Sequence, residues 1–223
     1  MLGVIVASLA ALSHAAAAKD VAAAPGQSPS PPPAVADPAK QIDVVEGVDY
    51  AYQAHVNGLP VRWPCTATIP VAIEGTVPAG ADAAVVAAVD VLRDASGLPL
   101  QVSHASEITE SEKGAIRIRY VDSGHQVYGM SVSETTLGRG GPTYDTEGTI
   151  VSGHVIIRDD IDPKIPLFDQ VLLHELAHAL GLGHAEQGQP ELMAPAASAS
   201  SQATLGRGDR FALRSIGCNA PRP

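Results

Sequence analysis

The 223-residue sequence is poor in cysteine, in aromatic residues and in positive charge. It has two cysteines, and only 4% of its residues are aromatic. Its 14 lysines and arginines stand against 24 aspartates and glutamates, which gives a formal net charge of −10. Nucleic-acid binding needs clustered positive charge to displace counterions, so this balance argues against a nucleic-acid partner. The sequence also lacks a glycine-rich phosphate loop and the Gly-x-Ser-x-Gly motif of serine hydrolases.

The two cysteines, Cys65 and Cys218, are too far apart in the sequence to form a CxxC-type zinc site. In an oxidising compartment we expect them to form one disulfide that closes a long loop. Such a bond would stabilise the fold by about 2–4 kcal/mol. Two free thiols, or a thiol that reaches a metal ion, are the alternatives.

The N-terminus has the features of a secretory signal. Residues 2–12 are almost wholly apolar, and Ala16-Ala17-Ala18 precedes the first charged residue, Lys19. This pattern is typical of a signal peptide with an A-x-A cleavage site, although no lysine or arginine precedes the apolar run. We therefore expect residues 1–18 to be removed and the protein to be secreted. A retained membrane anchor is the alternative, but the run is shorter than the ~20 residues of a membrane-spanning helix.

The rest of the chain divides by composition into a linker, a domain and a short tail. Residues 19–44 are rich in alanine, proline and serine, which predicts a flexible linker or a short pro-segment. We place one folded domain at residues 45–218 and a tail at 219–223. No other stretch is apolar enough to cross a membrane, so we expect no membrane contact after signal cleavage, and we expect a monomer.

Within the domain, predicted strands and helices alternate. Val85, Val89 and Leu92 recur at helical spacing and Gly97 follows as a stop, which predicts a helix at 81–95. From Ile116 onward, apolar residues alternate with Arg117 and Arg119, which indicates a half-buried strand. This alternation predicts a layered α/β or α+β domain. The other expected elements are strands at 68–74, 98–102 and 150–157, helices at 168–180 and 209–216, and surface loops at 138–141 and 196–202.

The most informative stretch contains three histidines at a spacing suited to one metal ion. His174 and His178 lie one above the other on a helix, so that both rings can bind one ion at about 2.0–2.1 Å. On a continuous helix, His184 would lie about 15 Å along the axis from His174 and could not reach that ion. The helix must therefore end, and Gly181 stands where the break is needed. Three neutral histidines would leave a fourth zinc position open for water, with Glu175 beside it as general base.

This stretch, His-Glu-x-x-His-x-x-Gly-x-x-His, resembles the zinc-binding signature of the metzincin metallopeptidases. Nine residues beyond His184, Met193 in Glu-Leu-Met-Ala-Pro resembles the Met-turn that supports zinc from below in this family. The residues of both motifs resemble those of the matrixin branch, which includes the matrix metalloproteases, and those of small secreted bacterial relatives. The resemblance covers residues 61–218 and is strongest at the zinc motif.

The resemblance implies an α+β, zincin-like fold. It implies a twisted, mostly parallel sheet with two long helices, a small C-terminal subdomain with the Met-turn and a last helix, and zinc in the cleft between them. Residues 150–157 would be the edge strand along which an extended peptide substrate binds. The implied activity is hydrolysis of peptide bonds by a zinc-activated water with Glu175 as base.

The sequence departs from this family in its pro-segment and in its further metal ligands. No cysteine precedes the domain to hold zinc in a latent state, which argues against a cysteine switch. The order of Asp122, His125, Asp145 and His154 fits a second, structural zinc poorly, and we expect none. Calcium binding is one interpretation of Asp159, Asp160 and Asp162, which carry suitable oxygen ligands. The alternative is that these three residues form a solvated acidic turn.

Two functional alternatives to the endopeptidase remain. One is a binding protein that keeps the zinc but has no activity, and the other is a zinc amidase that acts on a non-peptide amide. Arg207-Gly208-Asp209 spells an adhesion tripeptide, but we interpret Asp209 as the start of the last helix, where an acidic residue is favourable. His55 and His104 have no partner at motif spacing, and we expect both at the surface.

Overall fold

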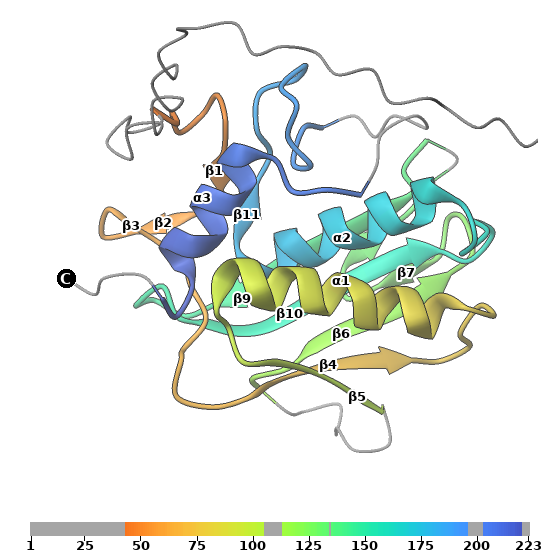
Figure 1. Cartoon of the computed structure of the whole chain (residues 1–223). Coiled ribbons are helices and arrows are strands. Elements are labelled where there is room, and N and C mark those ends of the chain that lie inside the picture. The colour runs from red at the N-terminus through yellow and green to blue at the C-terminus, as the bar shows by residue number, and fades with distance from the viewer. Residues whose placement is uncertain (1–42, 105–112, 134, 196–202, 220–223) are drawn as a thin grey trace, which may run out of the picture. The chain divides into compact units, whose positions relative to one another are not determined.

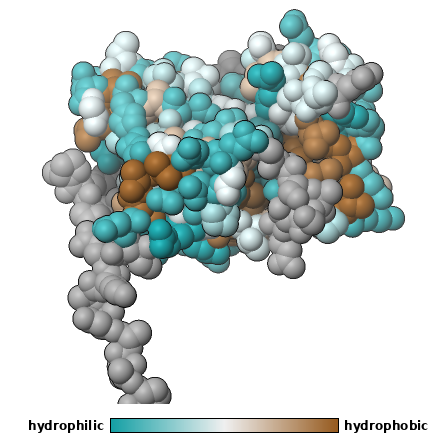
Figure 2. All heavy atoms as spheres, turned by 90° about the horizontal axis from the view of Figure 1, so that it is seen from above, coloured by the Kyte–Doolittle hydropathy of each residue, from teal (hydrophilic) through white to brown (hydrophobic). Residues whose placement is uncertain are grey.

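The computed structural model describes residues 43–104, 113–133, 135–195 and 203–219. The predicted signal peptide, most of the linker and the predicted loop at 196–202 lie outside these residues. Within them, no helix is long and apolar enough to cross a bilayer. On the face seen in Figure 2, apolar residues form separate patches in a mostly hydrophilic surface.

In the described residues, the domain is a mixed α/β structure with a mostly parallel sheet of five strands and three helices (Figure 1). The strand order is β5-β4-β6-β10-β9, and only β9 runs antiparallel to its neighbour. The elements of the sheet and the helices are β4 (Ile69–Glu74), α1 (Ala81–Ser96), β5 (Leu100–His104), β6 (Ile116–Val121), β9 (Gly138–Tyr144), β10 (Ile150–Arg158), α2 (Pro166–Leu180) and α3 (Arg207–Ile216). Short strand pairs are formed by β1 (Ala51–Tyr52) with β11 (Leu182–Gly183), β2 (His55–Val56) with β3 (Leu59–Pro60), and β7 (Gln126–Val127) with β8 (Met130–Ser131).

Most predicted elements are present with bounds shifted by one or two residues. The helix predicted at 81–95 is α1, and Gly97 ends it in a left-handed conformation, as expected. Helix α2 begins at Pro166, two residues before the predicted start, because a proline at the first helical position needs no hydrogen-bonded N–H. Helices α1 and α2 lie together on one face of the sheet (Figure 1).

Two expectations about the edge of the sheet are wrong. Residues 138–141 do not form a surface loop but begin strand β9, and the strand expected at the edge, β10, lies inside the sheet between β6 and β9. The glycines and Pro142 of β9 hide its strand character, because both residue types are depleted in strands. Pro142 fits an edge strand, where a missing N–H leaves no central ladder bond unmade.

The apolar core lies between the sheet and the helices, and Trp63 is buried in it. Its indole Nε1 donates to the backbone oxygen of Ala179 in α2 at 3.0 Å. The expected disulfide between Cys65 and Cys218 is confirmed, with the two Cα atoms 5.6 Å apart. This bond ties the segment between β3 and β4 to the residues that follow α3.

On the opposite face of the sheet, a buried carboxylate holds a cluster of polar side chains. Strand β6 alternates as predicted, with Arg117 and Arg119 pointing away from the main core, yet Arg117 is buried. Both arginines donate to Glu74 of β4, Arg119 through its Nη2 at 2.9 Å. The hydroxyl of Tyr128 also donates to Glu74. The turn between β7 and β8 is thereby held against the sheet.

Candidate metal centre

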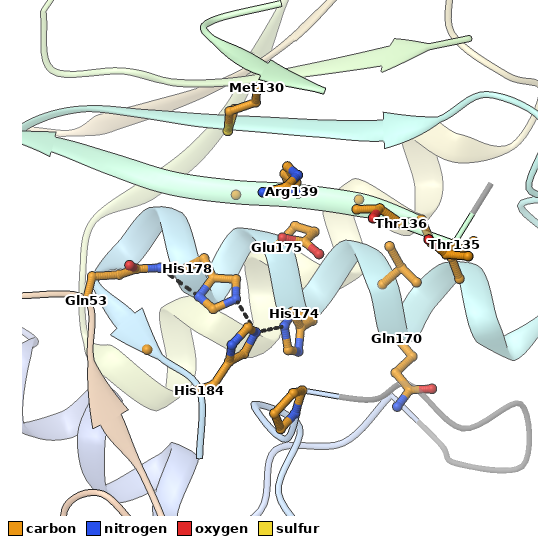
Figure 3. Close-up of a pocket in the computed structure, with 16 residues that line it drawn as sticks. Gln53, Met130, Thr135, Thr136, Arg139, Gln170, His174, Glu175, His178 and His184 are labelled. Carbon is orange, nitrogen blue, oxygen red and sulfur yellow. Dashed lines mark hydrogen bonds between the residues drawn. The ribbon is translucent and has the colours of Figure 1, made fainter. Parts of the chain in front are cut away.

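Helix α2 presents the first two histidines, and the turn at its end brings the third to them (Figure 3). Gly181 caps the helix with a φ of 112°, a conformation that glycine adopts without strain. The chain then turns through β11 to His184. The Nε2 atom of His184 lies 3.2 Å from Nε2 of His174 and 3.1 Å from Nε2 of His178. The predicted bend at Gly181 is therefore present.

The hydrogen bonds of the first two rings show where their protons are. Nδ1 of His174 donates to the oxygen of Leu192 at 2.8 Å, and Nδ1 of His178 donates to the oxygen of Leu182 at 2.7 Å. A carbonyl oxygen only accepts, so in each neutral ring the proton is on Nδ1 and Nε2 carries a lone pair. Burial lowers the pKa of His174 to about 4 and that of His178 to about 3, which keeps both rings neutral at pH 7.

These lone pairs converge on one point, which fits a bound cation. Tetrahedral bonds of 2.0–2.1 Å place two ligand nitrogens about 3.3 Å apart, close to the observed separations. In its neutral form the ring of His184 carries one proton, so its Nε2 could donate to at most one of these two lone pairs, whereas a shared cation would satisfy all three nitrogens. Among the described residues, these three histidines are the one group of histidine, cysteine and acidic side chains close enough to hold a metal ion.

Glu175 faces the same cavity, which has a volume of about 720 Å³ and is lined by α2, β9 and the loop at Pro195. The side chain is buried, and burial raises its pKa to about 8 although the backbone N–H of Gly140 donates to it. A cation on the neighbouring histidines would favour the charged carboxylate and lower this pKa. Figure 3 shows Glu175 between α2 and β9, on the side of the helix that faces the strand.

Two glycines allow β9 to lie directly against Glu175. A Cβ atom at Gly138 would lie 2.8 Å from Cγ of Glu175, and one at Gly140 would lie 2.1 Å from its backbone oxygen. The sequence analysis missed this role because it assigned these residues to a loop. The signal available was their spacing of two, which places both glycines on the same face of a strand.

The segment expected to be the Met-turn is hydrogen-bonded to the chain at the first and third histidines. Met193 is buried, and its backbone oxygen accepts a hydrogen bond from the N–H of Ala185, next to His184. The residue before Met193, Leu192, connects His174 to Asp209. Its backbone oxygen accepts the bond from His174, and its N–H donates to Asp209 at 2.6 Å. The last helix thus holds the loop that orients the first histidine.

Asp209 lies in the first turn of the last helix, where an acidic residue was expected, although the helix begins two residues earlier than predicted. Helix α3 begins at Arg207, and Asp209 is fully buried in its first turn. Its carboxylate accepts from the N–H groups of Leu192, Met193 and Gly206 at 2.6, 3.3 and 2.8 Å. A buried aspartate cannot serve as the acidic member of an exposed adhesion tripeptide. Asp209 contacts a loop that lies 16 residues earlier in the chain. No sequence motif with a fixed spacing predicts such a contact.

The other candidate ligands lie apart from the three histidines. Oδ1 of Asp145 accepts the N–H groups of Glu147 and Thr149 within its own turn. His154 stacks on Tyr128, with ring centroids 4.4 Å apart. Asp160 pairs with Arg158.

The remaining positions named in the sequence analysis are at the surface or within a strand. Asp162 accepts the N–H of Lys164, and Asp159 lies beside Asp122. His55 is exposed, as expected, and its Nε2 lies 3.2 Å from Glu46. His104 ends strand β5.

A scan of protein-family models gave no match to this chain, and a comparison with curated proteins gave none either.

Proposed function

We propose that this chain is a secreted zinc-dependent endopeptidase of the metzincin type, similar to the matrixins. The observation that carries the proposal is the convergence of the three histidine Nε2 atoms in a cavity that Glu175 also lines. A set of three histidines favours zinc among the common metals and leaves a coordination position for chemistry.

His174, His178 and His184 would hold the ion, and the carbonyls of Leu182 and Leu192 fix the orientation of two of these rings. When bound, zinc polarises a carbonyl and makes water more acidic at neutral pH. Among the described residues that line the cavity, Glu175 is the one carboxylate. It would take a proton from the attacking water and deliver it to the departing amine of the cleaved bond.

The outer edge of β9 is suited to binding the substrate. Within the described residues, β9 pairs only with β10 and its other edge is unpaired. An extended peptide could add a strand there through main-chain hydrogen bonds, with its scissile bond beside Glu175. In this proposal a protein or peptide substrate would lie in the cleft along β9, which would take the role that the resemblance gave to residues 150–157.

The disulfide is compatible with secretion, because such bonds persist in oxidising compartments. Of the three candidate calcium ligands Asp159, Asp160 and Asp162, Asp160 accepts from Arg158 and Asp162 accepts from the N–H of Lys164, which favours a solvated acidic turn over a calcium site.

The decisive experiment compares peptide-library cleavage by the wild type, Glu175→Gln and Glu147→Gln. Glu147 is exposed and does not line the cavity, so its variant controls for the loss of one carboxylate. We expect cleavage by the wild type and by Glu147→Gln, loss of at least about 100-fold in Glu175→Gln, and inhibition by a zinc chelator. Zinc binding without any cleavage above Glu175→Gln would favour a non-catalytic binding protein. Cleavage of non-peptide amides alone would favour the amidase.

A further inference from the structure

The turn that carries the chain from the second histidine to the third is paired along its length with an N-terminal strand. Strand β1 runs antiparallel to β11, with Ala51 opposite Gly183 and Tyr52 opposite Leu182. The next residue, Gln53, donates its backbone N–H to the oxygen of Gly181 at 2.8 Å. Three successive residues of the N-terminal segment therefore hold the three residues that place His184.

This pairing is close enough to restrict the turn. A Cβ atom at Gly183 would lie only 2.7 Å from the backbone oxygen of Tyr52, so the turn tolerates no side chain there without a shift of β1. Figure 1 shows β1 and β11 beside each other, next to α3. The position of His184 relative to the two helical histidines therefore depends on β1.

The side chain of Gln53 extends this contact to the metal site itself. Its amide Nε2 lies 2.9 Å from Nδ1 of His178, and Figure 3 shows the two side chains facing each other. Nδ1 must keep its proton for Nε2 to bind a cation, and this proton is already shared with the oxygen of Leu182. A donor beside Nδ1 would oppose that tautomer, whereas an acceptor would favour it. Rotation of the amide about its terminal bond presents its oxygen instead.

We propose that Gln53 is a positioning residue of the metal centre. Its amide oxygen accepts a second hydrogen bond from Nδ1–H of His178, and its backbone N–H holds Gly181. The N-terminal strand thereby reinforces the tautomer of His178 that the oxygen of Leu182 already favours, and it holds the turn that places His184. The proposal rests on metal binding by the three histidines and does not require that the protein cleaves peptides.

The test is the zinc affinity of the full chain, measured by competition with a chromophoric chelator. Three variants at one position separate the contributions. Gln53→Met keeps the length but cannot accept, Gln53→Glu can only accept, and Gln53→Asp adds the same charge on a shorter side chain. Loss of a group that orients a ligand costs about 10–100-fold in metal affinity. We expect Gln53→Met to bind zinc about 10-fold more weakly, Gln53→Glu to bind at least as tightly as wild type, and Gln53→Asp to bind more weakly than Gln53→Glu.

A second readout is the tautomer of His178, observed through the ¹⁵N shifts of its ring in the zinc-loaded chain. We expect a protonated Nδ1 with a stronger hydrogen bond in Gln53→Glu than in Gln53→Met. The proposal is overturned if Gln53→Met binds zinc within about twofold of wild type, or if Gln53→Glu and Gln53→Met weaken binding equally. A wild type that binds zinc but cleaves nothing would remove the peptidase function and leave this proposal standing. A wild type that binds no zinc would remove both.

Discussion

Replacing Gly140 by alanine tests whether β9 must lie directly against Glu175. The added Cβ atom would lie 2.1 Å from the backbone oxygen of Glu175, where ordinary contact begins near 3.4 Å. Strand β9 and helix α2 would have to separate by about 1 Å, and the N–H of Gly140 would move away from the carboxylate it contacts. Overpacking of this kind costs about 2–3 kcal/mol of folding free energy.

The matched control is Gly141→Ala, because nothing lies within 4 Å of a Cβ atom at that position. For a domain of this size, the expected loss in Gly140→Ala lowers the melting temperature by about 5–10 °C. Thermal unfolding followed by circular dichroism measures it, and peptide cleavage measures the displacement of Glu175. If Gly140→Ala and Gly141→Ala unfold at the same temperature, the argument from close approach is wrong.

Three further predictions concern buried polar groups. Asp209→Asn replaces one accepting oxygen by an amide donor beside three backbone N–H groups. We expect this variant to lose about 1–3 kcal/mol of unfolding free energy, measured with denaturant, and to bind zinc more weakly. An unchanged unfolding free energy would contradict this prediction. Gln170 is buried in the cavity wall, and its Oε1 has no hydrogen-bond partner within the described part of the chain. Gln170→Met should therefore raise the unfolding free energy by about 1 kcal/mol, and a decrease would count against this account. Burial alone would raise the pKa of Glu74, but hydrogen bonds from Tyr128, Arg117 and Arg119 outweigh burial and lower it. The stability this group contributes is therefore present above about pH 4.5 and lost as the pH falls through the lowered pKa, so Glu74→Gln should flatten the acid limb of a stability–pH curve, and an unchanged limb would refute the assignment.

The local features of the metal centre could be predicted from the sequence. The two helical histidines follow from a spacing of four. The bend at Gly181 was predicted because His184 could not reach the same ion from a continuous helix, and Gly181 has a φ of 112° in the structure. Helix α1 and strand β6 were predicted for the same reason, since their apolar residues recur at the period of the element. Each of these signals lies within a few consecutive residues.

The contacts between distant segments could not be predicted in this way. Strand β9 has glycines where a strand usually has branched or aromatic residues, because these positions are selected by the approach of α2 rather than by propensity. Asp209 and Gln53 reach the site from α3 and from the N-terminal strand. The fold brings both residues close to the histidines, and no motif with a fixed spacing predicts these contacts from the sequence.

The most direct test of the central claim is the zinc stoichiometry and affinity of the purified chain and of four single variants. We expect one zinc ion per wild-type chain, and a loss of affinity of at least about 100-fold when His174, His178 or His184 is replaced by alanine. His55→Ala, which removes an exposed histidine outside the cavity, should bind zinc like the wild type. A wild type that binds no zinc, or a His184→Ala variant that binds it as tightly as the wild type, would contradict the account.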